Sequence, residues 1–379
     1  MTTLLSRLTS TGTFMVNGAL DEVTKTINSV DSATVYSAGF DEVTLFGQSS
    51  PQQSQTSTGT LLVSNGFDEL TIQGGSTNGG VQYVTPGTYS WTCPVDVTSV
   101  SVVAIGGGGS PGVGTPSIFG AGGGAGGGLG WKNNIAVVPG QTYTVVVGSG
   151  GASPSATSQT GVNGNSGTVS YFISTATVAG YGGMGGVGTI SSSSVFTATG
   201  GSFVGDGGGI GGQGGIPASS GFNATYSVPG GGGGAGGYTG NGGNGGGGQS
   251  NSAGTNGTSG AGGGGSPGVT GSITQGGGGG GVGPYGLGKN GIGSSQSPYD
   301  SGSQRTYSAT GGSGGLPFTA IFTATGGLYG GGSAAYTAQG NHGAPPADAN
   351  GTVRIIWPGN IRQFPSTASV TTVINEAVI

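Results

Sequence analysis

The stretch Gly87-Thr-Tyr-Ser-Trp-Thr-Cys-Pro-Val-Asp-Val-Thr-Ser-Val-Ser-Val-Val-Ala-Ile-Gly-Gly-Gly-Gly109 decides how the rest of the sequence is interpreted. Its second half, Ser99-Val-Ser-Val-Val-Ala-Ile105, is rich in β-branched residues and predicts a strand. This strand runs straight into glycine at position 106. We therefore expect a β-domain from which the chain passes into a glycine-rich body.

Further strand-like segments lie on both sides of the glycine runs. Residues 81–92 form two short β-rich runs around Pro86-Gly87, and the runs 135–138 and 142–147 bracket Pro139-Gly140. Far along the chain, the alternation in Thr352-Val-Arg-Ile-Ile-Trp357 places Val353, Ile355 and Trp357 on one face. We predict a β-sandwich-like domain at 81–180 plus 350–358, a glycine-rich insertion at 180–349 and a β-type tail at 359–379.

The glycine content restricts what the insertion can form. The chain has 97 glycines among 379 residues, about one in four against an average near 7%. Runs such as 276–281 break the collagen period, and backbone entropy disfavours glycine inside an α-helix or an ordinary sheet. We predict polyglycine-II helices, which have three residues per turn and, lacking Cβ atoms, can hydrogen-bond backbone to backbone. The expected fold class is mostly β with a polyglycine-II helix bundle and little or no α-helix.

The charge composition excludes several classes of function. The chain has 7 Lys+Arg, 12 Asp+Glu and 1 His, with a net charge of −5, and between residues 97 and 288 only Lys132 and Asp206 are charged. One cysteine, Cys93, and one histidine, His342, cannot make a clustered metal site. No basic stripe is available for phosphates, and no apolar run approaches the roughly 18 residues of a membrane helix. We expect no enzyme activity, no cofactor or metal, no nucleic-acid partner and no membrane insertion.

Residues 1–75 contain a loose threefold repeat. Each unit has two β-rich runs separated by Asn17-Gly18, Ala38-Gly39 or Asn65-Gly66, which predicts β-hairpins. An Asp-Glu pair follows each turn, giving six docking candidates: Asp21, Glu22, Asp41, Glu42, Asp68 and Glu69. Two interpretations stay open, a segment that docks onto a larger assembly and a meander whose acidic edge blocks aggregation.

Aromatic side chains between the glycine runs supply candidates for surface recognition. Aromatics on loops are favoured anchors for protein or carbohydrate surfaces; the alternative is that they cover the flanks of the glycine body. A local patch combines tyrosines with rare charges, and its members are the receptor-contact candidates: Tyr285, Tyr299, Tyr307, Lys289, Asp300 and Arg305.

The segment 87–109 resembles the opening of glycine-rich domains in virion proteins of tailed phages, especially of the cyanophage type. The segments Gly128-Leu-Gly-Trp-Lys-Asn-Asn-Ile135, Pro139-Gly-Gln-Thr-Tyr-Thr-Val-Val-Val147 and Asn350-Gly-Thr-Val-Arg-Ile-Ile-Trp357 fit the same family. The glycine body is also similar to the polyglycine-helix sandwich of phage tail-fibre adhesins. This resemblance implies a virion structural protein, and phage fibres in general imply a homotrimer.

We therefore expect a phage virion protein that forms an oligomeric fibre or appendage. Residues 1–75 would contact other virion proteins, and the glycine body would project outward with host-surface carbohydrate or protein as a further partner. One alternative is a decoration protein of the capsid, neck or tail without receptor binding. An alternative of another class is a glycine-helix ice-binding protein. Because no signal peptide is recognisable at the N-terminus, the expected location is the virion, assembled in the host cytoplasm.

Overall fold

The computed structural model describes most of the chain after residue 78 and the strands before it. The described residues are 3–8, 14–15, 22–28, 35–36, 42–48, 69–74, 79–114, 121–154, 161–188, 197–217, 229–248, 258–267, 276–287, 289–293, 326–335, 349–366 and 377–378. The chain divides into two compact units, Met1–Gly80 with Val373–Ala377 (unit 1) and Val81–Thr372 with Val378–Ile379 (unit 2). The described residues contain strands and no helix, so the prediction of a mostly β fold is confirmed.

Unit 1 contains a sheet in which the long strands lie in chain order and all pair in parallel. These strands are β1 (Thr3–Leu8), β3 (Glu22–Asn28), β5 (Glu42–Gln48) and β6 (Glu69–Gly74). A second parallel pair joins the short strands β2 (Phe14–Met15) and β4 (Val35–Tyr36).

This pairing differs from the predicted hairpins, which would bring successive strands together antiparallel. Here each long strand pairs with the next long strand, and residues 9–21 and 29–41, which include β2 and β4, connect them. Connections of about a dozen residues are what parallel neighbours require. The repeat therefore stacks equivalent strands in register, and the hairpin prediction is wrong for these strands; the turns themselves lie outside the described residues.

Two antiparallel sheets enclose a common core, whose residues belong to unit 2. The six-stranded sheet has the order β15 (Gly207–Gly209), β10 (Leu129–Ala136), β9 (Ser99–Ile105), β16 (Thr352–Trp357), β7 (Gly79–Tyr83) and β17 (Ala377–Val378). The five-stranded sheet has the order β14 (Phe203–Val204), β13 (Val178–Gly180), β12 (Ser170–Phe172), β11 (Thr142–Val147) and β8 (Gly87–Thr92).

Successive side chains of β9 point to opposite faces of the sheet and enter two different cores. Val100, Val102 and Ala104 belong to the core between the two sheets, which also holds Phe172. Val103 and Ile105 point to the opposite face and belong to a second core. Because both faces of β9 are covered, all seven of its residues are buried. On β16, Val353 and Ile355 enter the first core and Trp357 packs against it, as the sequence alternation predicted.

The second core joins the six-stranded sheet to the base of the glycine segments. Ala235 and Val282 lie within such segments and pack here with Leu129 and Ile356. The fully buried Tyr238 organises this core: its ring stacks on Phe364 at 5.7 Å between centroids, and its hydroxyl donates to the Gly283 carbonyl oxygen at 3.2 Å. The glycine segments are therefore anchored to the sheet by ordinary hydrophobic packing.

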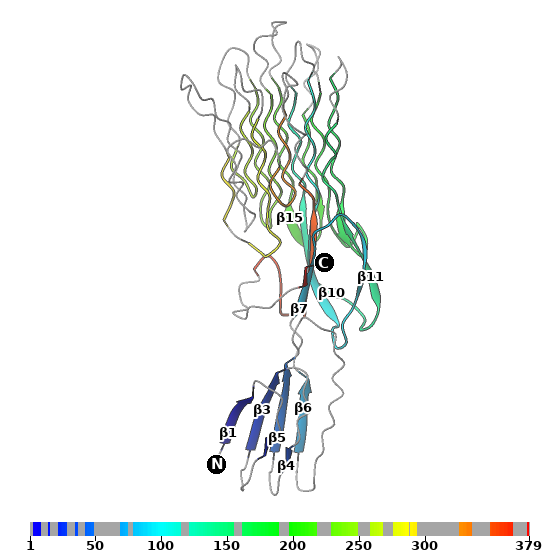
Figure 1. The fold of residues 1–379 in the computed structure, drawn as a ribbon, viewed down its shortest axis with the longest axis vertical. Coiled ribbons are helices and arrows are strands. Elements are labelled where there is room, and N and C mark those ends of the chain that lie inside the picture. Colours follow the sequence, from blue (N-terminus) through cyan, green and yellow to red (C-terminus); the bar gives the residue numbers. More distant parts are fainter. Residues whose placement is uncertain are drawn as a thin grey trace. The chain divides into compact units, whose positions relative to one another are not determined.

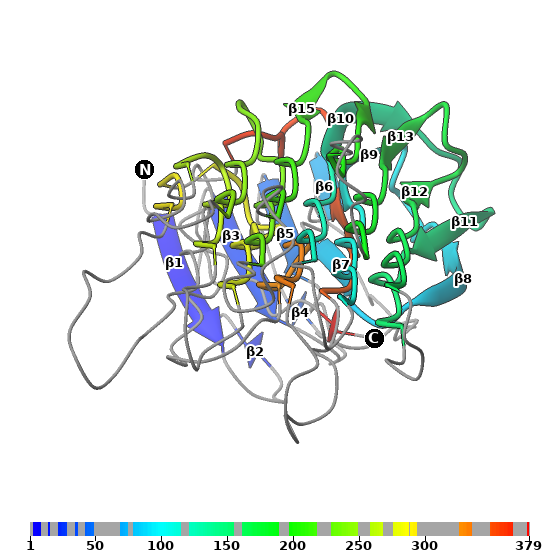
Figure 2. The ribbon, with the colours of Figure 1, turned by 90° about the horizontal axis from the view of Figure 1, so that it is seen from above.

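From this base the glycine segments run side by side away from the sheets (Figure 1), and from above they are separate coils packed against one another (Figure 2). Their hydrogen bonds have a three-residue period. The N–H groups of residues 106, 109 and 112 donate to carbonyl groups in 121–128, whereas those of 107, 110 and 113 donate to 161–168. A threefold helix of the polyproline-II type turns its successive peptide groups in three directions in this way.

The segment 229–237 shows how far this cross-linking extends. Its N–H groups donate to 121–128, 240–248 and 276–280, and its carbonyl groups accept from 210–217, 258–267 and 326–335. It is thus bonded to neighbours on all sides, which leaves little room for side chains at most of its positions. A Cβ atom on Gly233 would lie closer than 3.0 Å to the carbonyl oxygen of Gly212, a separation that real Cβ atoms essentially never show. Glycine is required here for close approach of backbones.

Alkaline pH is expected to destabilise unit 2. Burial, with a smaller contribution from the neighbouring Tyr89, raises the pKa of Tyr83 to about 12, and burial also raises the pKa of Tyr238. A tyrosine that is harder to ionise in the folded state stabilises it fully below pH 10, the unfolded pKa, and this contribution is lost as the pH rises through the folded pKa. The free energy of unfolding should therefore fall between pH 10 and pH 12.

Urea titrations at several alkaline pH values measure this fall. Tyr83→Phe should reduce the slope, whereas Val138→Ala, at an exposed residue that does not titrate, should leave it unchanged. An equal slope in Tyr83→Phe and the parent would contradict the assignment to Tyr83.

Candidate binding surfaces

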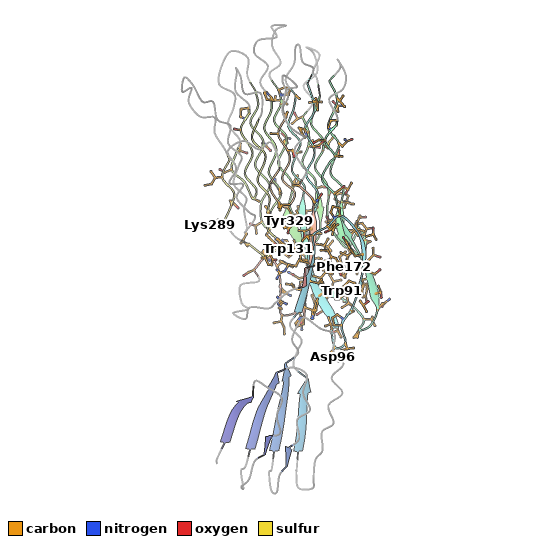
Figure 3. The ribbon with its side chains drawn as sticks, in the orientation of Figure 1. Trp91, Asp96, Trp131, Phe172, Lys289 and Tyr329 are labelled. Carbon is orange, nitrogen blue, oxygen red and sulfur yellow. The ribbon has the colours of Figure 1, made fainter. Side chains whose placement is uncertain are left out.

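Two of the six receptor-contact candidates lie within the described residues. Tyr285 and Lys289 follow the glycine segment 276–283, and both are exposed, Tyr285 to 54%. The other candidates, Tyr299, Asp300, Arg305 and Tyr307, lie outside the described residues. Figure 3 shows Lys289 at a flank of unit 2, away from Trp91 and Phe172, which meet in the first core at 5.8 Å between ring centroids.

Tyr285 is held in place by a polar network on the face of the six-stranded sheet that is opposite the first core. Its hydroxyl donates to Gln82 Oε1 at 2.8 Å, and Gln82 Nε2 donates to the Tyr329 hydroxyl at 3.1 Å and to Thr352 Oγ1 at 3.2 Å. Thr352 Oγ1 in turn donates to the Tyr83 carbonyl oxygen at 2.7 Å. Because Gln82 and Thr352 come from β7 and β16, the network joins a sheet to the segment that follows the glycine run.

Arg354 adds a buried cation to this arrangement. The guanidinium group lies 4.5 Å from the centre of the Tyr285 ring, and Nη1 donates to the Pro284 carbonyl oxygen at 3.1 Å. The residue is only 5% exposed, and a buried charge is costly unless it is compensated. The aromatic face and the carbonyl oxygen provide such compensation. One face of Tyr285 and its hydroxyl thus have a structural role, although the residue is 54% exposed.

The acidic docking candidates are partly placed by the register of unit 1. Glu22, Glu42 and Glu69 occupy equivalent positions on β3, β5 and β6, so three acidic residues sit at one level of the parallel sheet. Neighbouring strands in a sheet are about 4.8 Å apart. Asp21, Asp41 and Asp68 lie outside the described residues.

The described part of the chain offers no cluster of side chains for binding a metal ion. No group of three or more His, Cys, Asp or Glu side chains occurs there that could hold a metal ion. The Cys93 thiol is buried and donates to the Val97 carbonyl oxygen at 3.2 Å, and burial raises its pKa. Cys93 is therefore packed as a small apolar side chain. No helix in the described ranges has the length and hydropathy needed to cross a membrane.

The sequence that forms most of the sandwich strands and glycine segments matches a known protein family. The model of a glycine-rich domain matches residues 84–287, more than half of the chain. The chain belongs to this glycine-rich domain family. No curated protein matches it. The glycine-rich domain thus includes β8 to β15 and the glycine segments up to residue 287, and its last residues include Tyr285.

Several residues that shape the glycine-rich domain and its surroundings were not singled out from the sequence. Gln82 and Arg354 hold Tyr285, yet they lie more than 200 positions apart along the chain. Arg354 carried a recognisable signal, since it is a lone charge inside the apolar run 352–357. Asn241 and Asn244 accept hydrogen bonds from backbone N–H groups of a neighbouring glycine segment. Their spacing of three residues matches the period of the hydrogen bonds.

Proposed function

We propose that the chain is a non-enzymatic structural protein of a tailed-phage virion, a fibre or appendage in which the glycine segments form a stiff projecting body. The observation that carries this proposal is the continuous backbone cross-linking of the glycine segments, including a segment bonded to neighbours on all sides. Such a body holds its shape without charge or a large apolar core. We also infer that the segments are polyglycine-II helices, since their hydrogen bonds repeat every three residues.

The attachment part of the proposal concerns unit 1. Residues 1–75 would dock the chain to other virion proteins, because the repeat places three glutamates at one level of a sheet and a repeated row of acidic residues suits a repeated partner. Host-surface binding would involve the exposed part of Tyr285 and Lys289. We also propose assembly in the host cytoplasm and a homotrimeric state, both of which rest on the resemblance to phage fibres.

The proposal is tested on particles of a phage that encodes the chain. Deleting the gene should remove an appendage visible by electron microscopy, and adding the purified full-length chain should restore it. The variant Glu22→Gln/Glu42→Gln/Glu69→Gln should bind these particles more weakly by at least tenfold, with Lys289→Gln as a control outside unit 1. Particles that never contain the chain would overturn the virion assignment. Binding of the triple variant at the parent level would remove the docking role of the glutamates.

The rate of adsorption to host cells distinguishes an appendage that binds the host surface from a decoration protein without receptor binding. If particles without the chain adsorb to host cells more slowly, and the added chain restores the rate, the appendage contributes to attachment. If the rate is unchanged while the appendage is missing, the protein is a structural or decorative component.

A further inference from the structure

At the outer edge of the glycine segments, side chains accept hydrogen bonds from backbone N–H groups. In residues 210–216, the N–H groups of 211 and 214 donate to the segment at 198–201, and those of 212 and 215 donate to 231–234. The third direction belongs to the N–H groups of Ile210 and Gln213. These two groups donate to side chains, Ile210 N to Asn241 Oδ1 at 3.0 Å and Gln213 N to Asn244 Oδ1 at 2.9 Å.

The same arrangement recurs at other edges. The N–H group of Asn244 donates to Thr258 Oγ1 at 2.7 Å, one segment further along. In a separate part of the glycine array, Gly188 N donates to Asn163 Oδ1 at 2.9 Å and Gly185 N donates to Ser166 Oγ at 3.3 Å. The accepting residues are three positions apart in both pairs, 241 with 244 and 163 with 166. Three residues are one turn, or roughly 9 Å of rise, so one side chain is available for each outward peptide group.

These side chains replace a backbone partner. Inside the array, the N–H groups of residues 230–236 donate to carbonyl groups of neighbouring glycine segments. A row of outward N–H groups at the same spacing would offer the same bonds to a glycine segment of a second copy. Sheet edges with unpaired N–H and C=O groups have the same liability for edge-to-edge association. Asn241 and Asn244 are both exposed, so they stand where such a segment would have to bind.

We propose that Asn241 and Asn244 act as edge caps that prevent a second copy of this chain from adding its glycine segments to residues 210–216. The caps give the array a defined width. Copies in an oligomer then associate through other surfaces, and each glycine array stays a separate body. The occupant that the caps exclude is the glycine array of another copy, because its carbonyl groups have the spacing of the two capped N–H groups.

The test uses the full-length variant Asn241→Ala/Asn244→Ala. Amide hydrogen exchange, resolved by residue, should become at least tenfold faster at Ile210 and Gln213. Sedimentation velocity over a range of concentrations should show species larger than those of the parent. The variant Asn241→Asp/Asn244→Asp keeps an acceptor oxygen at each position and should restore slow exchange at both amides.

A matched control is Gln213→Ala, which removes an exposed amide side chain from the same edge and leaves the capped backbone N–H group in place. It should match the parent in exchange and in sedimentation. If the double alanine variant is not folded, the single variant Asn241→Ala should still accelerate exchange at Ile210 and leave Gln213 unaffected. Exchange at the parent rate in the alanine variants would overturn the caps themselves. Faster exchange without larger species would overturn their role against association.

Discussion

Gly126→Ala is expected to lower the free energy of unfolding of unit 2 by about 3 kcal/mol. Gly126 lies in segment 121–128; its N–H group donates to the Gly212 carbonyl oxygen at 2.9 Å, and its own carbonyl oxygen accepts from Gly201 N at 2.9 Å. An added Cβ would lie closer than 3.0 Å to the carbonyl oxygen of Gly234. Because the obstructing atom belongs to a backbone that is itself hydrogen-bonded, several segments must shift together. Urea unfolding followed by tryptophan fluorescence measures the loss, since all three tryptophans lie in unit 2.

Two positions serve as comparisons for this variant. Gly240→Ala should change the stability by no more than about 0.5 kcal/mol, because a Cβ there meets nothing within 4 Å. Ala125, next to Gly126, already carries a methyl group in a fully buried place, which shows that the array accepts a side chain where its neighbours leave room. Equal stabilities of Gly126→Ala and Gly240→Ala would contradict the close packing of backbones.

Phe172→Ala is expected to destabilise unit 2 by about 3–5 kcal/mol. Phe172 is fully buried in the core between the sheets, with its ring centroid 5.8 Å from Trp91 and 5.9 Å from Tyr143. Removing the ring loses its burial and leaves a cavity that the surrounding strands can fill only in part. The midpoint of urea unfolding should decrease, and Trp91 emission in the folded state should change because its ring partner is missing.

The matched control in the same unit is Val138→Ala. Val138 is 57% exposed, so truncating it should change the unfolding free energy by no more than about 0.5 kcal/mol. If Phe172→Ala were as mild as Val138→Ala, the core between the sheets would not be the main source of stability in the sandwich.

The predictions for Gly126→Ala and Phe172→Ala concern two different kinds of packing within unit 2. The sandwich is stabilised by apolar side chains, so it loses stability when a large side chain is removed. The glycine array is stabilised by backbone hydrogen bonds at close approach, so it loses stability when even one methyl group is added. The second core, in which Ala235 and Val282 meet Ile105 and Ile356, is where one kind of packing changes to the other.

Sequence patterns predicted several strands of unit 2 because alternation is a local property, although the run 135–138 covers only the end of β10 and the strands β14 and β15 lie within the predicted insertion. The runs at 99–105, 142–147 and 352–357 were recognised, and strands were found there as β9, β11 and β16. The hairpins of residues 1–75 were predicted from turn signals that are equally local. The structure pairs the long strands in parallel instead, because equivalent positions of a repeat can stack on one another, and a turn signal does not report which strands meet.

The candidate binding surface shows the same difference between local sequence signals and contacts that depend on the tertiary structure. Tyr285 was recognised as an aromatic residue near rare charges, but its contacts with Gln82 and Arg354 depend on the closure of the six-stranded sheet by β7 and β16. Asn241 and Asn244 have a visible spacing of three, yet their role depends on which segment lies beside them.

The sequence by itself determined that this chain is a β protein with a nearly uncharged glycine-rich body, because alternation and the absence of Cβ atoms act residue by residue. It also determined that the glycine runs must satisfy their peptide groups against one another. Only the tertiary structure decided which runs become neighbours. Glycine has no side chain that distinguishes one partner from another, so the neighbours of segment 106–114, for example, follow from where β9 and the other strands of the sandwich release and receive the chain.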